Sequence, residues 1–313
     1  RARSVVVSST VSDLPTTDPA CLDAGRPAVD LVIQGRPRDL GTVVVSRILP
    51  AARRRMVGPF VFLDHMGPVE LAPGVGFDVR PHPHIGLSTV TYFLAGTNVH
   101  RDNLGTVQVN RPFDLNLMTA GRGVVHSERA EPSFRATGGL MHGLQIWLAL
   151  PDAHEDDAPS FEHHPASTLP VIAPAAGARG RVLLGSGFGA TSPVVHPSEP
   201  WLIDLELDPG ARVDVPTGPP ERGIFVVEGA LDAGGQLLGR NELGVLGGAA
   251  VPVVAIERTR AILLGGPSPG PRLLEWNFVA STRERIDRAR DAWRRQDYVK
   301  IPTDADEFIP LPV

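Results

Sequence analysis

The chain has almost no cysteine and no long apolar run. Cys21 is the single cysteine among 313 residues, so no disulfide can form within the chain, which fits a reducing compartment. No stretch approaches the ~18 consecutive apolar residues of a membrane-spanning helix. The positively charged residues 1–8 are not followed by the apolar segment of a secretion signal. We therefore expect a soluble, cytoplasmic protein with no membrane partner.

Positive charge is not in excess either. The chain carries 30 Lys and Arg against 35 Asp and Glu, for a net charge of -5. No global basic field therefore attracts nucleic acid or anionic lipid, and we expect no direct binding of nucleic acid. The phosphate-binding loop Gly-x-x-x-x-Gly-Lys-Ser/Thr and the nucleophile motif Gly-x-Ser-x-Gly are also absent. The sequence thus gives no support to P-loop or serine-hydrolase chemistry.

Glycine and proline are abundant, with 33 and 31 residues, while 42% of the chain is hydrophobic and 21% charged. This is a globular composition, and the apolar runs are short. Short runs between Gly and Pro turns predict many brief strands, and hence an all-β fold. One short C-terminal helix is expected over residues 281–296, where Ser281-Thr282-Arg283-Glu284 fits a capping box.

The length is sufficient for two domains of ordinary size. Residues 1–30 are predicted to form an extended or mobile arm, and residues 31–151 a first β-rich domain. Residues 152–170 lack apolar periodicity and are the candidate linker. Residues 171–313 are predicted to form a second β-rich domain with the helix and a tail. Two β-rich halves of similar size indicate two tandem antiparallel barrels.

Two pairs of polar residues carry the chemistry of the first half. His82 and His84 lie two residues apart, and so do His126 and Glu128. Side chains at this spacing on a β-strand point to the same face. Two such strands facing one lumen could place three imidazoles and one carboxylate around a single ion. The sequence therefore predicts a metal site with these four residues as ligands.

The spacing around the first pair matches a known metal-binding pattern. Gly76 precedes His82 as in the first cupin motif. That motif normally has a glutamate four or five positions after its second histidine, where this chain has Ser88 and Thr89. Glu128 in the second pair restores the missing oxygen ligand on the same face.

Imidazoles and one carboxylate suit Fe²⁺, with Mn, Ni, Cu or Zn as alternatives. Four protein ligands around an ion that prefers six leave two positions for water, dioxygen or a chelating substrate. The alternative is a surface loop with solvated imidazoles. All ten histidines lie at or before His196, so we expect no metal ligands in the second domain.

Other residues are weaker candidates for the pocket. His65 could touch it, or it could be a core histidine whose polar atoms are satisfied. Ser88 and Gln145 are possible pocket residues, and Arg122 could steer an anion to the site or hold its loop by a salt bridge. His100 is expected to be solvated or ion-paired.

At these residues the chain resembles the pirin family, a branch of the bicupin superfamily. The resemblance extends over roughly residues 35 to 312. Its matching motifs are residues 60–65, 77–87, 100–105, 118–128 and 142–147. It implies two stacked antiparallel β-barrels, with one iron in the N-terminal barrel. By position, the ligands it implies are His82, His84, His126 and Glu128.

Two functions of different classes follow from this resemblance, because some pirins are quercetin 2,3-dioxygenases and others are regulators. The first hypothesis is an iron-dependent dioxygenase acting on a flavonol-like or other enolic chelator, with Glu128 as a possible base for the substrate hydroxyl. The alternative is a metal-dependent regulatory protein that binds a transcription factor or metabolic enzyme and has no catalysis of its own.

Overall fold

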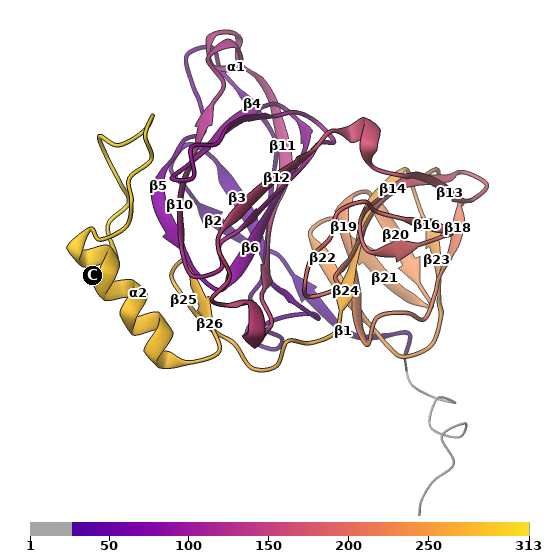
Figure 1. Ribbon diagram of the computed structural model, residues 1–313. Coiled ribbons are helices and arrows are strands. Elements are labelled where there is room, and N and C mark those ends of the chain that lie inside the picture. The colour runs from indigo at the N-terminus through magenta and orange to yellow at the C-terminus, as the bar shows by residue number, and fades with distance from the viewer. Residues whose placement is uncertain (1–26, 313) are drawn as a thin grey trace, which may run out of the picture.

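The protein consists of two antiparallel β-barrels that lie side by side (Figure 1). The computed structural model describes residues 27–312, so most of the predicted arm lies outside the described residues. The expected all-β architecture of two tandem barrels with a C-terminal helix is confirmed. Within the described part of the chain, no helix is long and apolar enough to cross a membrane.

The first barrel pairs a seven-stranded sheet, ordered β12-β9-β6-β11-β4-β3-β2, with a four-stranded sheet, ordered β5-β10-β7-β8. The short helix α1, Pro132–Thr137, joins β10 to β11 and was not expected from the sequence. The strand bounds are β2 Arg36–Asp39, β3 Val44–Leu49, β4 Phe60–Leu71, β5 Val79–His84, β6 Leu87–Ala95, β7 Asn98–Asp102, β8 Val107–Asn110, β9 Leu115–Thr119, β10 Val124–Ala130, β11 Gly139–Ala149 and β12 Ser160–His164.

The second barrel repeats this plan, with sheets ordered β1-β22-β19-β24-β17-β14-β13 and β18-β23-β20-β21. Two further two-stranded ribbons are β15-β16 and β25-β26. The strand bounds are β1 Val29–Gln34, β13 Val171–Ala175, β14 Ala178–Leu184, β15 Ser186–Gly187, β16 Ala190–Thr191, β17 Trp201–Leu207, β18 Arg212–Val215, β19 Glu221–Glu228, β20 Ala230–Ala233, β21 Gln236–Gly239, β22 Glu242–Leu246, β23 Val251–Ala255, β24 Thr259–Gly266, β25 Leu273–Glu275 and β26 Phe278–Ala280.

The largest hydrophobic cluster runs across the contact between the two barrels. It joins Ile146 and Leu148 of the first barrel to Phe225 and Ile262 of the second. The central strands of the two seven-stranded sheets are therefore buried on both faces. The sequences of these central strands are therefore almost continuously apolar, as in β24. Strand β18, by contrast, alternates between exposed and buried positions.

Each barrel contains or is covered by a segment from the other half of the chain, so the domain bounds differ from those expected. Strand β1 completes the sheet of the second barrel by pairing with β22, although residues 31–34 were assigned to the first domain. The candidate linker contains β12, which pairs with β9 of the first barrel. Beyond residue 272, the chain returns to the first barrel, where Phe278 and Trp293 pack on Ile85. Strand patterns in a sequence do not show which sheet edge a strand joins.

Helix α2, Arg283–Arg295, begins one residue later than the capping box suggested. The side chain of Thr282, not Ser281, accepts the hydrogen bond from a backbone N–H of the first turn. The Ser281 hydroxyl instead donates to the buried carboxylate of Glu155 at 2.6 Å. The helix ends at Gln296, which adopts a left-handed conformation. As expected, the buried face consists of Ile286, Ala289 and Trp293.

A pair of buried histidines lies where the barrels meet. His65 of β4 and His142 of β11 bring their Nε2 atoms to 2.8 Å. The Nδ1 atom of His65 lies 2.6 Å from the Asn241 side-chain oxygen of the second barrel. Burial is the largest cause that lowers the pKa of His65, to about 4. His65 is thus a neutral contact between the barrels at neutral pH.

This contact predicts a loss of stability in acid. Between pH 6.5 and about 4 the unfolded chain binds a proton at His65 that the folded chain does not bind, so stability falls as pH falls through that window. At about 1.4 kcal/mol per pH unit over about 2.5 units, the contribution of His65 is at most about 3.5 kcal/mol. The free energy of unfolding of the variant His65→Gln, measured in urea, should therefore depend less steeply on pH across this window. A variant with an unchanged dependence would contradict the assignment.

The matched control for this experiment is His154→Gln. The His154 side chain is 42% exposed, and its Nδ1 atom lies 2.7 Å from Asp157 Oδ2. The pH dependence of its unfolding free energy should follow that of the wild-type protein.

Candidate metal centre

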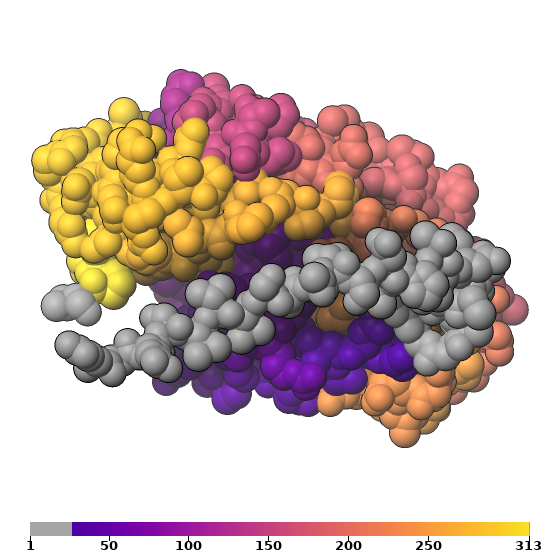
Figure 2. Space-filling model, turned by 90° about the horizontal axis from the view of Figure 1, so that it is seen from below, coloured from indigo at the N-terminus to yellow at the C-terminus, as the bar shows by residue number. Residues whose placement is uncertain are grey.

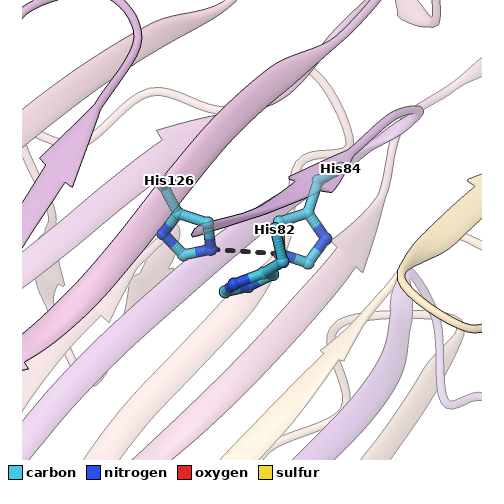
Figure 3. A group of neighbouring side chains, drawn as sticks. All are labelled: His82, His84 and His126. Atoms are coloured by element: carbon cyan, nitrogen blue, oxygen red, sulfur yellow. Dashed lines mark hydrogen bonds between the residues drawn. The ribbon is translucent and has the colours of Figure 1, made fainter. Parts of the chain in front are cut away.

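Three histidines from two neighbouring strands face one point inside the first barrel. Strand β10 pairs antiparallel with β5, which places His126 directly opposite His82. One ligand atom from each of His82, His84 and His126 lies within 4.8 Å of the others. Figure 3 shows the three rings turned toward one another, with His84 Nε2 and His126 Nε2 3.1 Å apart. The two-residue spacing thus produces the convergence that the sequence predicted.

The prolines of β5 are compatible with this strand because β5 is at the edge of its sheet. An edge strand tolerates residues without a backbone N–H. Pro81 and Pro83 alternate with the two histidines, so the imidazoles occupy the face that lines the barrel. All three histidines are buried, which excludes the alternative of a solvated surface loop.

Backbone carbonyl groups orient two of the three rings. His82 Nδ1 lies 2.8 Å from the carbonyl oxygen of Arg80, and His84 Nδ1 lies 2.9 Å from that of Asn277. Each Nδ1–H donates to its carbonyl oxygen, which leaves the Nε2 lone pair for the shared centre. This is the usual orientation of histidines that bind metals in proteins.

Burial also keeps these imidazoles uncharged. Burial lowers the pKa of His82 to about 4 and holds the pKa values of His84 and His126 well below their usual range. Neutral imidazole is the form that binds a metal, so no proton has to leave these rings at neutral pH. The donor set fits a divalent transition metal, and the three histidines are placed so that together they could hold one.

Glu128 lies beside this triad. It is buried, it lines the same cavity, and Thr91 Oγ1 donates to its Oε1 atom over a long 3.4 Å. Burial raises the pKa of its carboxyl group to about 7. The β5–β10 register shifts between His126 and Glu128, which marks a bulge there. The role of Glu128 as the fourth ligand stays a prediction.

The histidines open onto a cavity of about 470 Å³ with an aromatic wall. Phe62 and Trp147 stack with their ring centres 4.1 Å apart and their planes 14° apart. The Arg47 guanidinium lies over the outer side of the Phe62 ring, 4.5 Å from its centre, and forms two hydrogen bonds to Asp64. Trp147 also meets the edge of His84. The two stacked rings therefore contact the Arg47–Asp64 ion pair on one side and His84 on the other.

The C-terminal segment closes part of this cavity. Trp276, Asn277 and Ile309 line it, and the Ile309 N–H donates to the carbonyl oxygen of Pro81 at 2.8 Å. In the space-filling view the C-terminal residues, in yellow, lie against the first barrel (Figure 2). Sequence reasoning missed these residues because they are about as far from the histidines as the chain allows, and no local pattern marks them.

Of the four weaker pocket candidates, one lines the cavity. Gln145 does so, with its side-chain oxygen 3.1 Å from Thr91 Oγ1. Ser88 faces away and contacts His196 of the second half at 2.9 Å. His65 faces Asn241 as described above, and Arg122 lies on an outer groove beside α2. The side chains of Ser88 and His65 thus point away from the cavity. Alternation along a strand shows which residues share a face, but it does not show which face lines the cavity.

Two protein-family models match this chain, one in each half. The Pirin family model matches residues 42–148, and the model of the pirin C-terminal cupin domain matches residues 202–299. A pirin-like protein of Caulobacter vibrioides is 44% identical over 288 residues, which cover 91% of this chain and 99% of the relative.

Two solved structures extend the comparison. A quercetin 2,3-dioxygenase from Acinetobacter baumannii is 36% identical, has a TM-score of 0.84, and covers 90% of this chain and 95% of its own. A bacterial pirin from Escherichia coli, solved in complex with nickel(II), shares the fold at 18% identity, with a TM-score of 0.60 and coverage of 76% and 99%. The two family models span both barrels, and the close relative spans nearly the whole chain. The protein is therefore a member of the pirin family, with the two-domain cupin architecture.

Proposed function

We propose that this protein is a metal-dependent dioxygenase of the quercetinase type, acting on a planar, enolic aromatic chelator. The observation that carries the proposal is that the three convergent histidines open onto a cavity with a stacked aromatic wall. The similarity to the Acinetobacter baumannii quercetin 2,3-dioxygenase supports the same reaction class.

We assign Fe²⁺ to the site, held by His82, His84, His126 and Glu128. Mn, Ni, Cu and Zn suit the same donors. When bound, the ion supplies a Lewis acid for the chelating oxygens of the substrate and a redox centre for dioxygen.

The residues of the chain supply orientation and proton transfer. Phe62 and Trp147 line the cavity with apolar ring atoms, and contact of a substrate ring with such aromatic side chains contributes about 0.5–1.5 kcal/mol. Glu128, buried beside the triad, would accept the proton of a substrate hydroxyl. Trp276 and Ile309 cover the cavity and limit the access of water.

The test is turnover of quercetin by the iron-loaded protein. Anaerobic addition of quercetin should change the absorption spectrum of the metal site, and admission of air should consume oxygen in proportion to quercetin. A flavone without the 3-hydroxyl group is the matched control, since it keeps the planar rings but loses the enol. The variant Glu128→Gln should lose about 100-fold or more in kcat, the usual contribution of a general base. Iron-loaded protein that shows neither the spectral change nor oxygen consumption would refute the proposal.

A further inference from the structure

Two buried polar residues lie directly behind the metal ligand His126, and the function described so far does not use them. His100 and Asp102 belong to β7, which pairs with β10 on the side away from β5. In this register Asp102 is opposite His126, and His100 is opposite Glu128. His100 is 4% exposed and Asp102 is fully buried. Burial of both groups needs a compensating set of hydrogen bonds.

Those hydrogen bonds form a continuous chain that ends on the metal ligand. Asp102 Oδ1 accepts from the backbone N–H groups of Leu104 and Thr106, both at 2.9 Å. Asp102 Oδ2 lies 3.0 Å from His100 Nε2, and His100 Nδ1 lies 3.4 Å from His126 Nδ1. The last contact is long, so its role is orientation more than binding energy.

With both imidazoles neutral, one placement of protons satisfies the contacts from Asp102 to His126. The carboxylate of Asp102 can only accept, so the proton of His100 lies on Nε2. The Nδ1 atom of His100 is then a lone pair, and it accepts from Nδ1–H of His126. The Nε2 atom of His126, which faces His84 Nε2 at 3.1 Å, is left free for a metal.

A residue from the other sheet of the barrel also packs on the His100 ring. Phe161 of β12 stacks on it, with centres 4.3 Å apart and planes 22° apart. A ring held between Phe161, Asp102 and His126 has little freedom to turn. This is the arrangement expected of a group that orients another.

We propose that His100 and Asp102 are positioning residues that hold His126 with its Nδ1 protonated and its Nε2 directed to the metal. His82 and His84 obtain the same orientation from backbone carbonyl groups, which side-chain substitution does not remove. His126 is therefore the ligand whose orientation depends on side chains. The inference concerns metal binding and holds whatever reaction the site performs.

The variant Asp102→Asn tests the direction of these hydrogen bonds. Its amide oxygen can still accept from Leu104 and Thr106, but its NH₂ group then donates to His100 Nε2 and moves the His100 proton to Nδ1. That proton would oppose Nδ1–H of His126 and shift the His126 proton to the metal-facing nitrogen. The variant His100→Phe tests the same link differently, because it keeps a ring against Phe161 and removes the acceptor.

The measurement is the affinity of the chelator-stripped full-length protein for Ni²⁺, in competition with a chromophoric chelator. Both variants should bind Ni²⁺ about 10- to 100-fold more weakly than wild type, the usual effect of removing an outer-shell partner. Nitrogen-15 NMR of the metal-free protein should show His126 protonated at Nδ1 in wild type and altered in Asp102→Asn.

The matched control is His142→Phe, which removes a histidine that is also 4% exposed but lies outside the metal cavity. It should lower stability and leave Ni²⁺ affinity unchanged. Wild-type Ni²⁺ affinity in both test variants would overturn the proposal, as would a wild-type protein with the His126 proton on Nε2. If neither test variant folds, the NMR result for wild type still decides the question.

Discussion

Alanine in place of His126 should abolish tight metal binding without unfolding the protein. The site would retain two histidines on one strand and lose the only imidazole from β10. Removing a partner outside the ligand set costs about 10- to 100-fold in affinity, so loss of a ligand should exceed about 100-fold. The measurement is the metal content of protein loaded with Fe²⁺ or Ni²⁺ and then dialysed, compared with wild type.

The control for this experiment is His163→Ala. His163 lies on β12 and contacts Asn116 at 2.6 Å, outside the residues that line the metal cavity. This variant should keep about one metal per chain. One tightly bound metal in His126→Ala would show that the ion is held elsewhere.

Alanine in place of Asp204 should be the most destabilising substitution at the contact between the barrels. Asp204 is 1% exposed, and it accepts from the hydroxyl of Tyr92 at 2.7 Å across that contact. Arg260 donates to both of its carboxylate oxygens at 2.9 Å. Loss of the carboxylate leaves the Tyr92 hydroxyl buried without its partner and leaves the largely buried Arg260 guanidinium with Glu206 as its remaining ion pair. Breaking a buried ion pair in this way costs about 3–5 kcal/mol.

Urea unfolding measures this loss, with Asp208→Ala as the control. The Asp208 side chain is 54% exposed, and substitutions at such positions change the free energy of unfolding by about 0.5 kcal/mol or less. The double variant Asp204→Leu with Arg260→Met should recover part of the loss, because no buried charge remains. A loss below about 1 kcal/mol in Asp204→Ala would contradict the structural role assigned here.

The histidine triad could be predicted from the sequence because it depends on local geometry. His82 and His84 share one face of β5 because they are two residues apart, and the β5–β10 register places His126 opposite His82. The same rule could have found the relation of His100 to Asp102, since they also form a pair spaced by two. The sequence predicts that His100 is solvated or ion-paired, and the structure pairs it with Asp102 at 3.0 Å. The contact of His100 with His126 crosses from β7 to β10, which the spacing along one strand does not show.

Features that depend on distant parts of the chain could not be predicted. Alternation shows that Asp64 and His65 face opposite sides of β4, but it does not show which side is the cavity. The structure places Asp64 in the cavity and His65 toward the second barrel. The return of Asn277 to the carbonyl contact with His84 has no local signal at all.

The central claim is that His82, His84 and His126, together with Glu128, hold one metal ion in the first barrel. Anomalous X-ray scattering from crystals of the metal-loaded protein tests it most directly. We expect one strong peak, about 2.0–2.2 Å from the Nε2 atom of each histidine and from one carboxylate oxygen of Glu128. A peak at any other group of residues, or one bound to the histidines without Glu128, would contradict it.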